Sequence, residues 1–214
     1  MNRTASPTVA QPLNDTAQTP ALQHDAGWRP AIGLGVASLL LAGLAYAGLA
    51  TGIARLAFPD QAAGTLLRDA GGQVRGSAWL AQPFNGEGYF QARPSAAGYD
   101  PMAAAGSNLA RSNPALAARV AEATAAVAAR EGVPAAQVPA DLVTQSGGGL
   151  DPQLSPAAAQ LQVARVARAR GLPVEHVHAL LQRHTEAPQW GVFGQPRVNV
   201  VTLNFALDQA AAVP

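Results

Sequence analysis

The sequence predicts an α+β soluble domain anchored by one N-terminal transmembrane helix. A stretch without any charged residue runs from residue 30 to residue 54, between Arg29 and Arg55. After it come short, strand-like segments separated by glycines, and then longer segments with helical periodicity. The 214 residues are enough for one span and one domain of about 150 residues.

Residues 1–27 are polar and lack hydrophobic periodicity, which predicts a disordered leader. The uncharged stretch that follows is apolar on every helical face between residues 32 and 46. About 20 helical residues cross the hydrocarbon core of a bilayer, so residues 30–54 are predicted to form one transmembrane helix.

Two alternatives to a membrane anchor remain open. A buried core helix is usually shorter and polar on one face. A cleaved signal peptide is favoured by the A-x-A pattern at residues 45–47. Against cleavage, apolar residues continue past that site through Leu49, Ile53 and Leu56, and the polar leader is long. We therefore favour an uncleaved anchor in the lipid bilayer.

Small residues recur along the predicted span, and they allow a neighbouring helix to approach closely. We predict helix packing through Gly33, Gly35, Gly43 and Gly48. The alternative is the ordinary tolerance of membrane helices for glycine. The arginines near the span, one before it and Arg55, Arg68 and Arg75 after it, place the following domain in the cytoplasm if the positive-inside rule is taken literally. The rule weakens for long domains, so the charge pattern leaves the topology open.

Residues 56–214 form the predicted α+β domain. Strands are expected at residues 65–67, 73–75 and 77–80, with a further extended pair at Tyr89 and Phe90. Helices are expected from Pro114 to Arg130, from Ser155-Pro156 to a stop at Gly171, and over residues 174–183. The segment 197–207 fits either a strand or a helix.

Composition excludes several classes of function. A net charge of +1 gives no clustered basic surface for nucleic acid, so no nucleic-acid partner is expected. The chain has no cysteine, which removes disulfides and thiol catalysis. It also has no lysine, since every residue of its Lys+Arg total is arginine. A Walker A loop and lysine Schiff-base chemistry are therefore absent.

No catalytic or metal-binding constellation is apparent. His176 and His178 are two positions apart on a predicted helix and point away from each other, while His184 and Glu186 lack a third ligand nearby. No nucleophile motif of the GxSxG type occurs. We expect no metal site and no hydrolytic residues. The aromatic residues are expected in the core or an interface rather than in a stacking platform, namely Trp79, Trp190, Tyr89, Phe90 and Tyr99.

Several blocks together resemble one family. They read TGI at 51–53, FPDQA at 58–62, RPSAAGYD at 93–100, GSNL at 106–109, DLVTQSGGGLDP at 141–152, HTE at 184–186 and PRVNV at 196–200. In this order they resemble the C subunit of the bacterial Kdp potassium-transporting P-type ATPase. The likeness runs from Arg29 to about Asp208.

The resemblance implies a non-catalytic, single-pass subunit of the bacterial inner membrane, with its large domain outside the cytoplasm. Its implied partners are the potassium-channel-like A subunit, the ATP-hydrolysing B subunit and the small F subunit. Its implied role is to stabilise the assembly and to promote ATP binding and use by the B subunit. Potassium would be the transported ion and would not bind to this chain.

The glycine-rich loop is the sharpest candidate site. Backbone N–H groups beside a helix start can hold an anion, and the resemblance implies a contact with ATP through Gln145, Ser146, Gly147, Gly148, Gly149, Leu150 and Asp151. The alternative, which we favour, is a structural loop whose glycines need positive φ, because ATP is not expected outside the cytoplasm. Two other functions stay open: a membrane-tethered nucleotide-binding protein using this loop, and an independent ligand-binding domain on an anchor.

Overall fold

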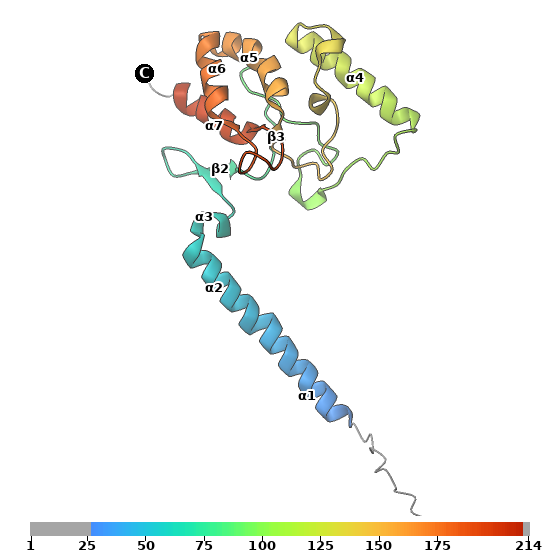
Figure 1. The fold of residues 1–214 in the computed structure, drawn as a ribbon, viewed down its shortest axis with the longest axis vertical. Coiled ribbons are helices and arrows are strands. Elements are labelled where there is room, and N and C mark those ends of the chain that lie inside the picture. The colour runs from blue at the N-terminus through green and yellow to red at the C-terminus, as the bar shows by residue number, and fades with distance from the viewer. Residues whose placement is uncertain (1–26, 212–214) are drawn as a thin grey trace, which may run out of the picture. The chain divides into compact units, whose positions relative to one another are not determined.

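The computed structural model describes residues 27–211 (Figure 1). The chain divides into two compact units, residues 1–52 and 53–214, which are considered separately. The predicted leader lies outside the described residues, apart from Gly27, as do residues 212–214.

One continuous helix covers the predicted span. It consists of α1 (Trp28–Ser38), a π-helical segment η1 (Leu39–Tyr46) and α2 (Ala47–Ala57). Its 30 residues have a mean hydropathy of 1.9 in their most apolar window, and 0% of that window is buried. The alternative of a buried core helix is therefore wrong. A signal sequence near the N-terminus would share this length and composition, so membrane anchoring stays a prediction.

The second unit begins with a short helix and a hairpin. Helix α3 (Pro59–Ala62) precedes β1 (Leu66–Arg68), which pairs antiparallel with β2 (Val74–Ser77). The strand predicted at residues 77–80 is wrong, because the chain turns after Ser77. The Ser77 hydroxyl accepts the N–H of Trp79 at 3.1 Å and donates to the carbonyl of Gly64 at 2.7 Å, which fixes that turn.

The predicted helices are confirmed as α4 (Pro114–Glu131), α5 (Pro156–Arg170) and α6 (Val174–Arg183). The Asn113 and Ser155 side chains cap the N-termini of α4 and α5. Gly132 and Gly171 end these two helices with φ values of 69° and 64°, a left-handed conformation that glycine adopts at little cost. Short 3-10 helices η2 (Pro101–Ala103), η3 (Ala135–Gln137) and η4 (Ala140–Leu142) lie between the longer elements.

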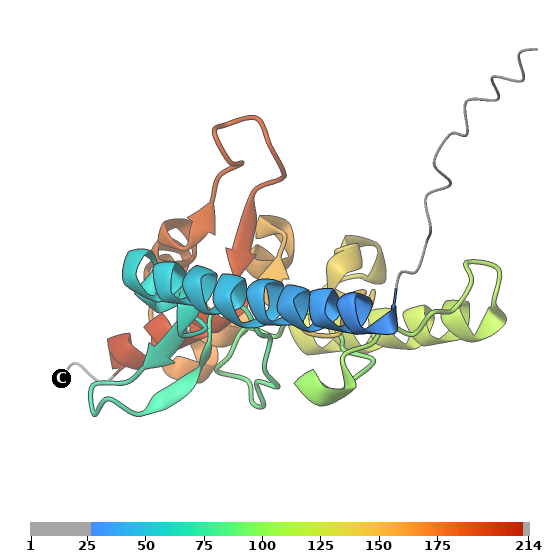
Figure 2. The same ribbon diagram turned by 90° about the horizontal axis from the view of Figure 1, so that it is seen from below.

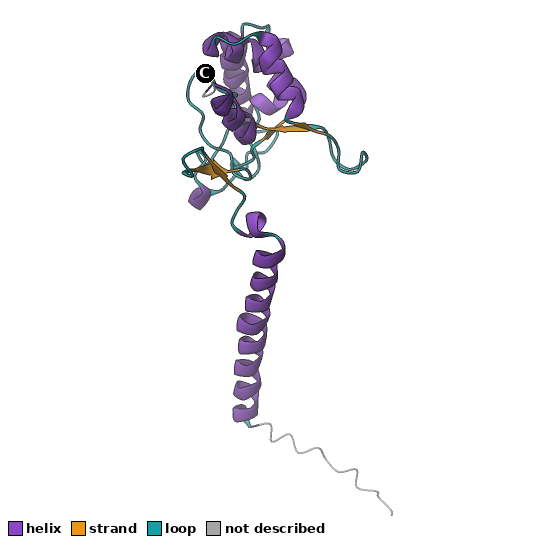
Figure 3. Cartoon of the chain, turned by 90° about the vertical axis from the view of Figure 1, so that its left-hand side faces the viewer, coloured by secondary structure: helices purple, strands orange, loops and turns teal. Residues whose placement is uncertain are grey.

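The ambiguous C-terminal segment is a strand followed by a helix. Strand β5 (Arg197–Asn199) lies between β3 (Gln153–Leu154) and β4 (Thr185–Glu186) in an antiparallel sheet, and α7 (Val200–Ala211) follows at once. Asn199 makes the change, because its Oδ1 accepts the N–H groups of Val201 and Thr202 at 3.0 and 3.1 Å. The connection between β4 and β5 projects from the helices of this unit (Figure 2 and Figure 3).

The core of the second unit lies among α5, α6, α7 and the loop that contains Phe90. Phe90 is fully buried, and the helices contribute mainly aliphatic side chains, including Val163, Val166, Val177, Leu181, Leu203 and Leu207. Burial of such side chains is the main favourable term in folding.

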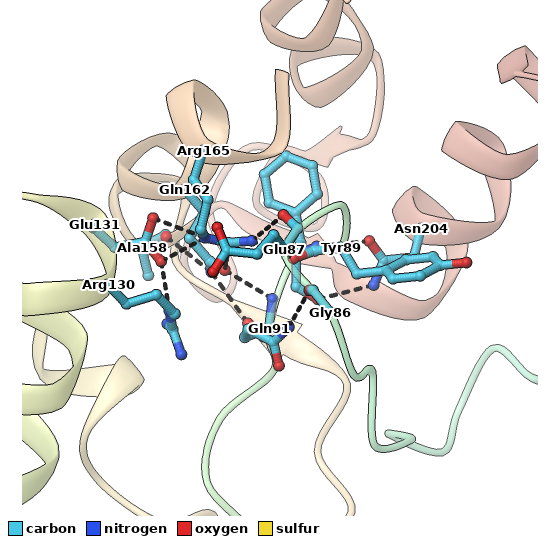
Figure 4. Close-up of polar contacts among 11 residues, drawn as sticks. Gly86, Glu87, Tyr89, Gln91, Arg130, Glu131, Ala158, Gln162, Arg165 and Asn204 are labelled. Atoms are coloured by element: carbon cyan, nitrogen blue, oxygen red, sulfur yellow. Dashed lines mark hydrogen bonds and ion pairs between the residues drawn. The ribbon is translucent and has the colours of Figure 1, made fainter. Parts of the chain in front are cut away.

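Two side-chain amides replace a neighbouring strand beside Phe90. The backbone N–H and carbonyl of Phe90 both bond to Asn204 of α7, each at 2.9 Å. The N–H of Gln91 donates to Oε1 of Gln162 at 2.7 Å, and Nε2 of Gln162 donates back to the Gln91 carbonyl at 3.1 Å. Figure 4 shows how Gln162 and Asn204 lie on either side of this segment. Phe90, one residue of the predicted extended pair, and the next residue Gln91 are thus bonded like a strand, but to side chains.

A buried ion pair completes this network (Figure 4). The side chain of Arg165 is 2% exposed and that of its partner Glu131 is 0% exposed, with the guanidinium Nε 3.0 Å from the carboxylate. Arg165 also donates to the carbonyls of Glu87 and Tyr89 and to Oε1 of Gln162. Removing charges from water is costly unless such additional bonds are made, and here they join α4 and α5 to the loop.

We predict that Gln162→Leu lowers the free energy of unfolding by about 2–4 kcal/mol, because the half-buried backbone of Gln91 and the buried guanidinium of Arg165 lose a partner. The matched control is Gln160→Leu on the same helix, where the side chain is exposed and a change of about 0.5 kcal/mol or less is expected. Urea unfolding followed by circular dichroism measures both. Equal stability of the two variants would contradict the assignment.

Candidate functional site

The glycine-rich loop is held by the rest of the second unit on both sides. Ser146 is 3% exposed, and its N–H donates to the carbonyl of Pro94 at 3.2 Å. The carbonyl of Leu150 accepts the N–H of Ala81 at 2.9 Å, and the carbonyl of Gln145 accepts a bond from Arg93 at 3.3 Å. The loop is therefore part of the framework of the domain.

The three glycines of the loop have different roles. Gly149 is buried and has φ of +72°, and a Cβ there would lie 2.9 Å from Oγ of Ser95 and 3.0 Å from the carbonyl of Ala105. Gly147 and Gly148 are exposed, lack positive φ and have open space where a Cβ would be. The structural need for glycine thus holds for Gly149 alone.

Carboxylates border this loop. Asp151 pairs with Arg93 at 3.1 Å, and its other oxygen accepts the N–H of Gln153 at 3.0 Å. Asp141 accepts the N–H of Ser155, the residue that caps α5, at 2.7 Å. Arg93 and the backbone N–H of Ser155 are therefore already bonded to carboxylates, which disfavours a bound phosphate. Contact between ATP and residues 145–151 stays a prediction.

A tight bend at residues 95–99 lies against Gly149 of the glycine-rich loop. The Ser95 hydroxyl accepts the N–H groups of Ala97 and Tyr99 at 3.1 and 2.9 Å. The Tyr99 hydroxyl donates to the carbonyl of Arg93 at 2.8 Å, and burial raises the pKa of this hydroxyl above its usual value. The bend therefore holds both Arg93 and the neighbours of Gly149 in place.

The glycines predicted for helix packing do not share one face. Gly33 and Gly35 both lie in α1, where positions two apart point about 200° away from each other. Gly48 lies in α2 together with Gly52, which the sequence analysis did not single out. These two are four positions apart and form a G-x-x-x-G pattern, a common contact between membrane helices. All five glycines of the helix have open space around them.

The three histidines among residues 27–211 lie on α6 or directly after it. Among residues 27–211, no three His, Asp or Glu side chains gather as metal ligands would. His176 and His178 lie on α6 as expected, and Nδ1 of His184 donates to the carbonyl of Leu180 at 2.9 Å.

The aromatic residues divide into two groups. Phe90 is in the core, as predicted, and Tyr89 and Tyr99 are half-buried. Trp79 is 60% exposed and Trp190 is 83% exposed, so the core is excluded for both. For these two tryptophans, a location in an interface stays a prediction.

A cavity of about 540 Å³ bears on the alternative of a ligand-binding domain. It lies between the β1–β2 hairpin and α7, with Phe84, Tyr89 and Phe205 among its lining residues. Its charged groups are already paired, Asp69 with Arg75 and Asp208 with Arg170, each at 2.8 Å. The lining therefore provides an apolar hollow without a charge that specifies a ligand.

We predict that Gly149→Ala destabilises the protein by about 1–3 kcal/mol, because the residue has positive φ and the new Cβ meets close neighbours. Gly148→Ala, one position earlier, should change the free energy of unfolding by about 0.5 kcal/mol or less. Thermal unfolding monitored by circular dichroism compares the two. A larger loss for Gly148→Ala would contradict this description of the loop.

The comparisons with known proteins all point to one family. The family model for KdpC, described as "K+-transporting ATPase, c chain", matches residues 28–209. A "Potassium-transporting ATPase KdpC subunit" of Xanthomonas campestris pv. campestris (strain B100) is 57% identical over 189 residues, which is 88% of this chain and 90% of that protein.

Two further relatives carry the same name. The protein of Xanthomonas axonopodis pv. citri (strain 306) is 58% identical over 191 residues, covering 88% of this chain and 92% of the relative. The protein of Shewanella putrefaciens (strain CN-32 / ATCC BAA-453) is 49% identical over 201 residues, covering 93% and 98%. The similarity therefore includes both the apolar helix and the domain that follows it.

Proposed function

The chain belongs to the KdpC family of K+-transporting ATPase subunits, and on this basis we propose that it is the accessory subunit that stabilises the complex and promotes ATP binding and use by the ATP-hydrolysing B subunit. Membership of the family makes it one component of a potassium-transporting ATPase, with other subunits as partners. The observation that carries the proposal is the family match over residues 28–209. In this role the chain neither hydrolyses ATP nor coordinates the transported potassium.

The proposed location is the bacterial inner membrane, with one span and the large domain outside the cytoplasm. The 30-residue helix with a mean hydropathy of 1.9 supports one crossing, because it exceeds the length that the hydrocarbon core requires. Reporter fusions after residue 211 test the orientation. An extracytoplasmic reporter should be active and a cytoplasmic reporter inactive; the reverse pattern would contradict this topology.

The proposed partners are the channel-like A subunit, the B subunit and the small F subunit. A helix of this complex is the proposed neighbour of Gly48 and Gly52, because two glycines one turn apart let helix backbones come close. Gly48 and Gly52 are both exposed, which leaves these positions accessible to such a neighbour.

We predict that the double variant Gly48→Leu, Gly52→Leu reduces co-purification of the A and B subunits severalfold, because the leucine side chains hold the helices apart. The matched control is the double variant Gly33→Leu, Gly35→Leu, at positions that point in opposite directions. It should reduce co-purification less. Quantitative affinity purification from detergent measures both. Retention of the subunits with the double variant would rule out this contact.

The effect on ATP use is tested in the assembled complex. We predict that the complex lacking this chain has a higher apparent KM for ATP and a lower rate of potassium-stimulated hydrolysis, and that adding the full-length chain restores both. An unchanged KM would contradict the proposed role.

The membrane-tethered nucleotide-binding alternative is tested by photolabelling with an azido-ATP. If the chain is labelled and the Gly148→Val variant is not, direct contact with ATP is supported. If the chain is not labelled, this alternative is ruled out.

A further inference from the structure

The connection between β4 and β5 presents three large apolar side chains to solvent. Trp190 is 83% exposed, Val192 76% and Phe193 62%. We call residues 188–194 the hairpin tip. It lies beyond the sheet to which its two strands belong (Figure 3), and the rings of Trp190 and Phe193 meet edge to face at 6.0 Å. Concentrated exposed apolar surface of this kind marks a site of interaction.

The backbone of the hairpin tip is well defined. Gln189 and Phe193 exchange both backbone hydrogen bonds, at 2.8 and 2.9 Å, and the N–H of Val192 donates to the carbonyl of Gln189 at 3.2 Å. Trp190 and Gly191 occupy the centre of the turn with φ of 54° and 76°. Positive φ at both central positions is the feature of type I′ turns, whose first central position favours asparagine or glycine.

A tryptophan at that position is unfavourable for the turn itself. A bulky residue with positive φ is strained, and its exposed indole gains nothing from the core. The turn therefore holds an indole outward at a cost in conformational energy. A partner that takes up the indole would account for this arrangement.

The charges around the hairpin tip indicate what kind of partner this is. Residues 187–196 contain no charged side chain. The first charges on either side, Glu186 and Arg197, neutralise each other at 2.9 Å. The hairpin tip can thus enter a medium of low dielectric constant without removing an unpaired charge from water. Tryptophan is the residue that favours the boundary between lipid and water.

The covalent structure keeps the start of β1, which belongs to the same unit as the hairpin tip, near such a boundary. Only residues 58–65 separate the end of α2 from the start of β1, and a stretch of this length spans at most about 28 Å. Three side chains are also few for a stable protein interface, which normally has about 20–30 residues on each side. They are sufficient for a shallow contact with lipid when the chain is already tethered to the bilayer.

We propose that the hairpin tip, through Trp190, Val192 and Phe193, inserts into the interfacial layer of the bilayer as a second membrane contact of the domain. This proposal rests on the anchoring of the apolar helix under the proposed function. The contact restricts rotation of the domain about its tether, because a domain held at two points has a defined face toward the membrane.

The absence of cysteine allows a direct test in the full-length chain. Val192→Cys carries a nitroxide label, and the protein is reconstituted into nanodiscs of phosphatidylcholine and phosphatidylglycerol. The collision rate of the nitroxide with oxygen, which concentrates in lipid, is compared with its collision rate with a water-soluble nickel chelate. We expect the oxygen-to-nickel ratio at position 192 to exceed severalfold that of Met102→Cys, a position that is 93% exposed in the same unit. Leu39→Cys in the apolar helix reports the lipid value.

A second variant separates lipid contact from folding of the hairpin. Trp190→Asn suits the type I′ turn, so the thermal unfolding temperature should be maintained or raised while the ratio at position 192 falls to that of Met102→Cys. If position 192 resembles Met102 while Leu39 reports lipid, the proposal is overturned and the anchor remains. If Leu39 also reports water, the anchoring fails and the proposal fails with it. If position 192 is shielded from both reagents only when the partner subunits are added, the hairpin tip contacts protein and not lipid. This outcome also overturns the proposal.

Discussion

The buried guanidinium of Arg165 joins parts of the domain that share no strand or helix. Its five donors are directed in a fixed, planar arrangement, and they reach a carboxylate on α4, an amide on α5 and two carbonyls of the loop before Phe90. A lysine ammonium could not reach these acceptors from one position. Because the partner Glu131 is also buried, the pair is only tolerable when all these bonds are made together. The ion pair thus requires the loop to be in place.

Around this pair, the amides of Gln162 and Asn204 perform the task of a missing strand. They satisfy the backbone of residues 90 and 91, which would otherwise be buried without partners. Phe90 can then occupy the centre of the core. The next residues lead to Arg93, which holds the glycine-rich loop through Gln145 and Asp151. The same set of contacts therefore positions both the core and the most distinctive loop.

Local signals in the sequence predicted the helices well. Pro114 and Ser155-Pro156 at the starts, and Gly171 at the end of α5, are explicit boundaries, and they depend only on neighbouring residues. The turn after Ser77 was missed because its stability comes from a contact between Ser77 and Gly64. The side-chain amide bonds to Phe90 and Gln91 were beyond reach, since their partners are 114 and 71 residues away. The ambiguity at residues 197–207 was real, because both structures occur there in succession.

In the candidate site too, local features were predictable from the sequence and contacts between remote residues were not. The position of the glycine-rich loop was evident in the sequence, but the distinction between Gly149 and its neighbours depends on Ser95 and Ala105, which are remote along the chain. The pair Gly48 and Gly52 was readable from spacing alone and was overlooked. Trp190 was expected in a core or an interface, and only the turn geometry shows that its indole is held outward.

The bonds between Phe90 and Asn204 also set an order of events during synthesis. Residues separated by 114 positions can meet only when the last helix has left the ribosome. The apolar helix emerges much earlier, while the domain is still unfolded. The hydrogen bonds around Phe90 are therefore completed only by a residue of α7. A chain without Asn204 would leave the buried N–H and carbonyl of Phe90 without these partners.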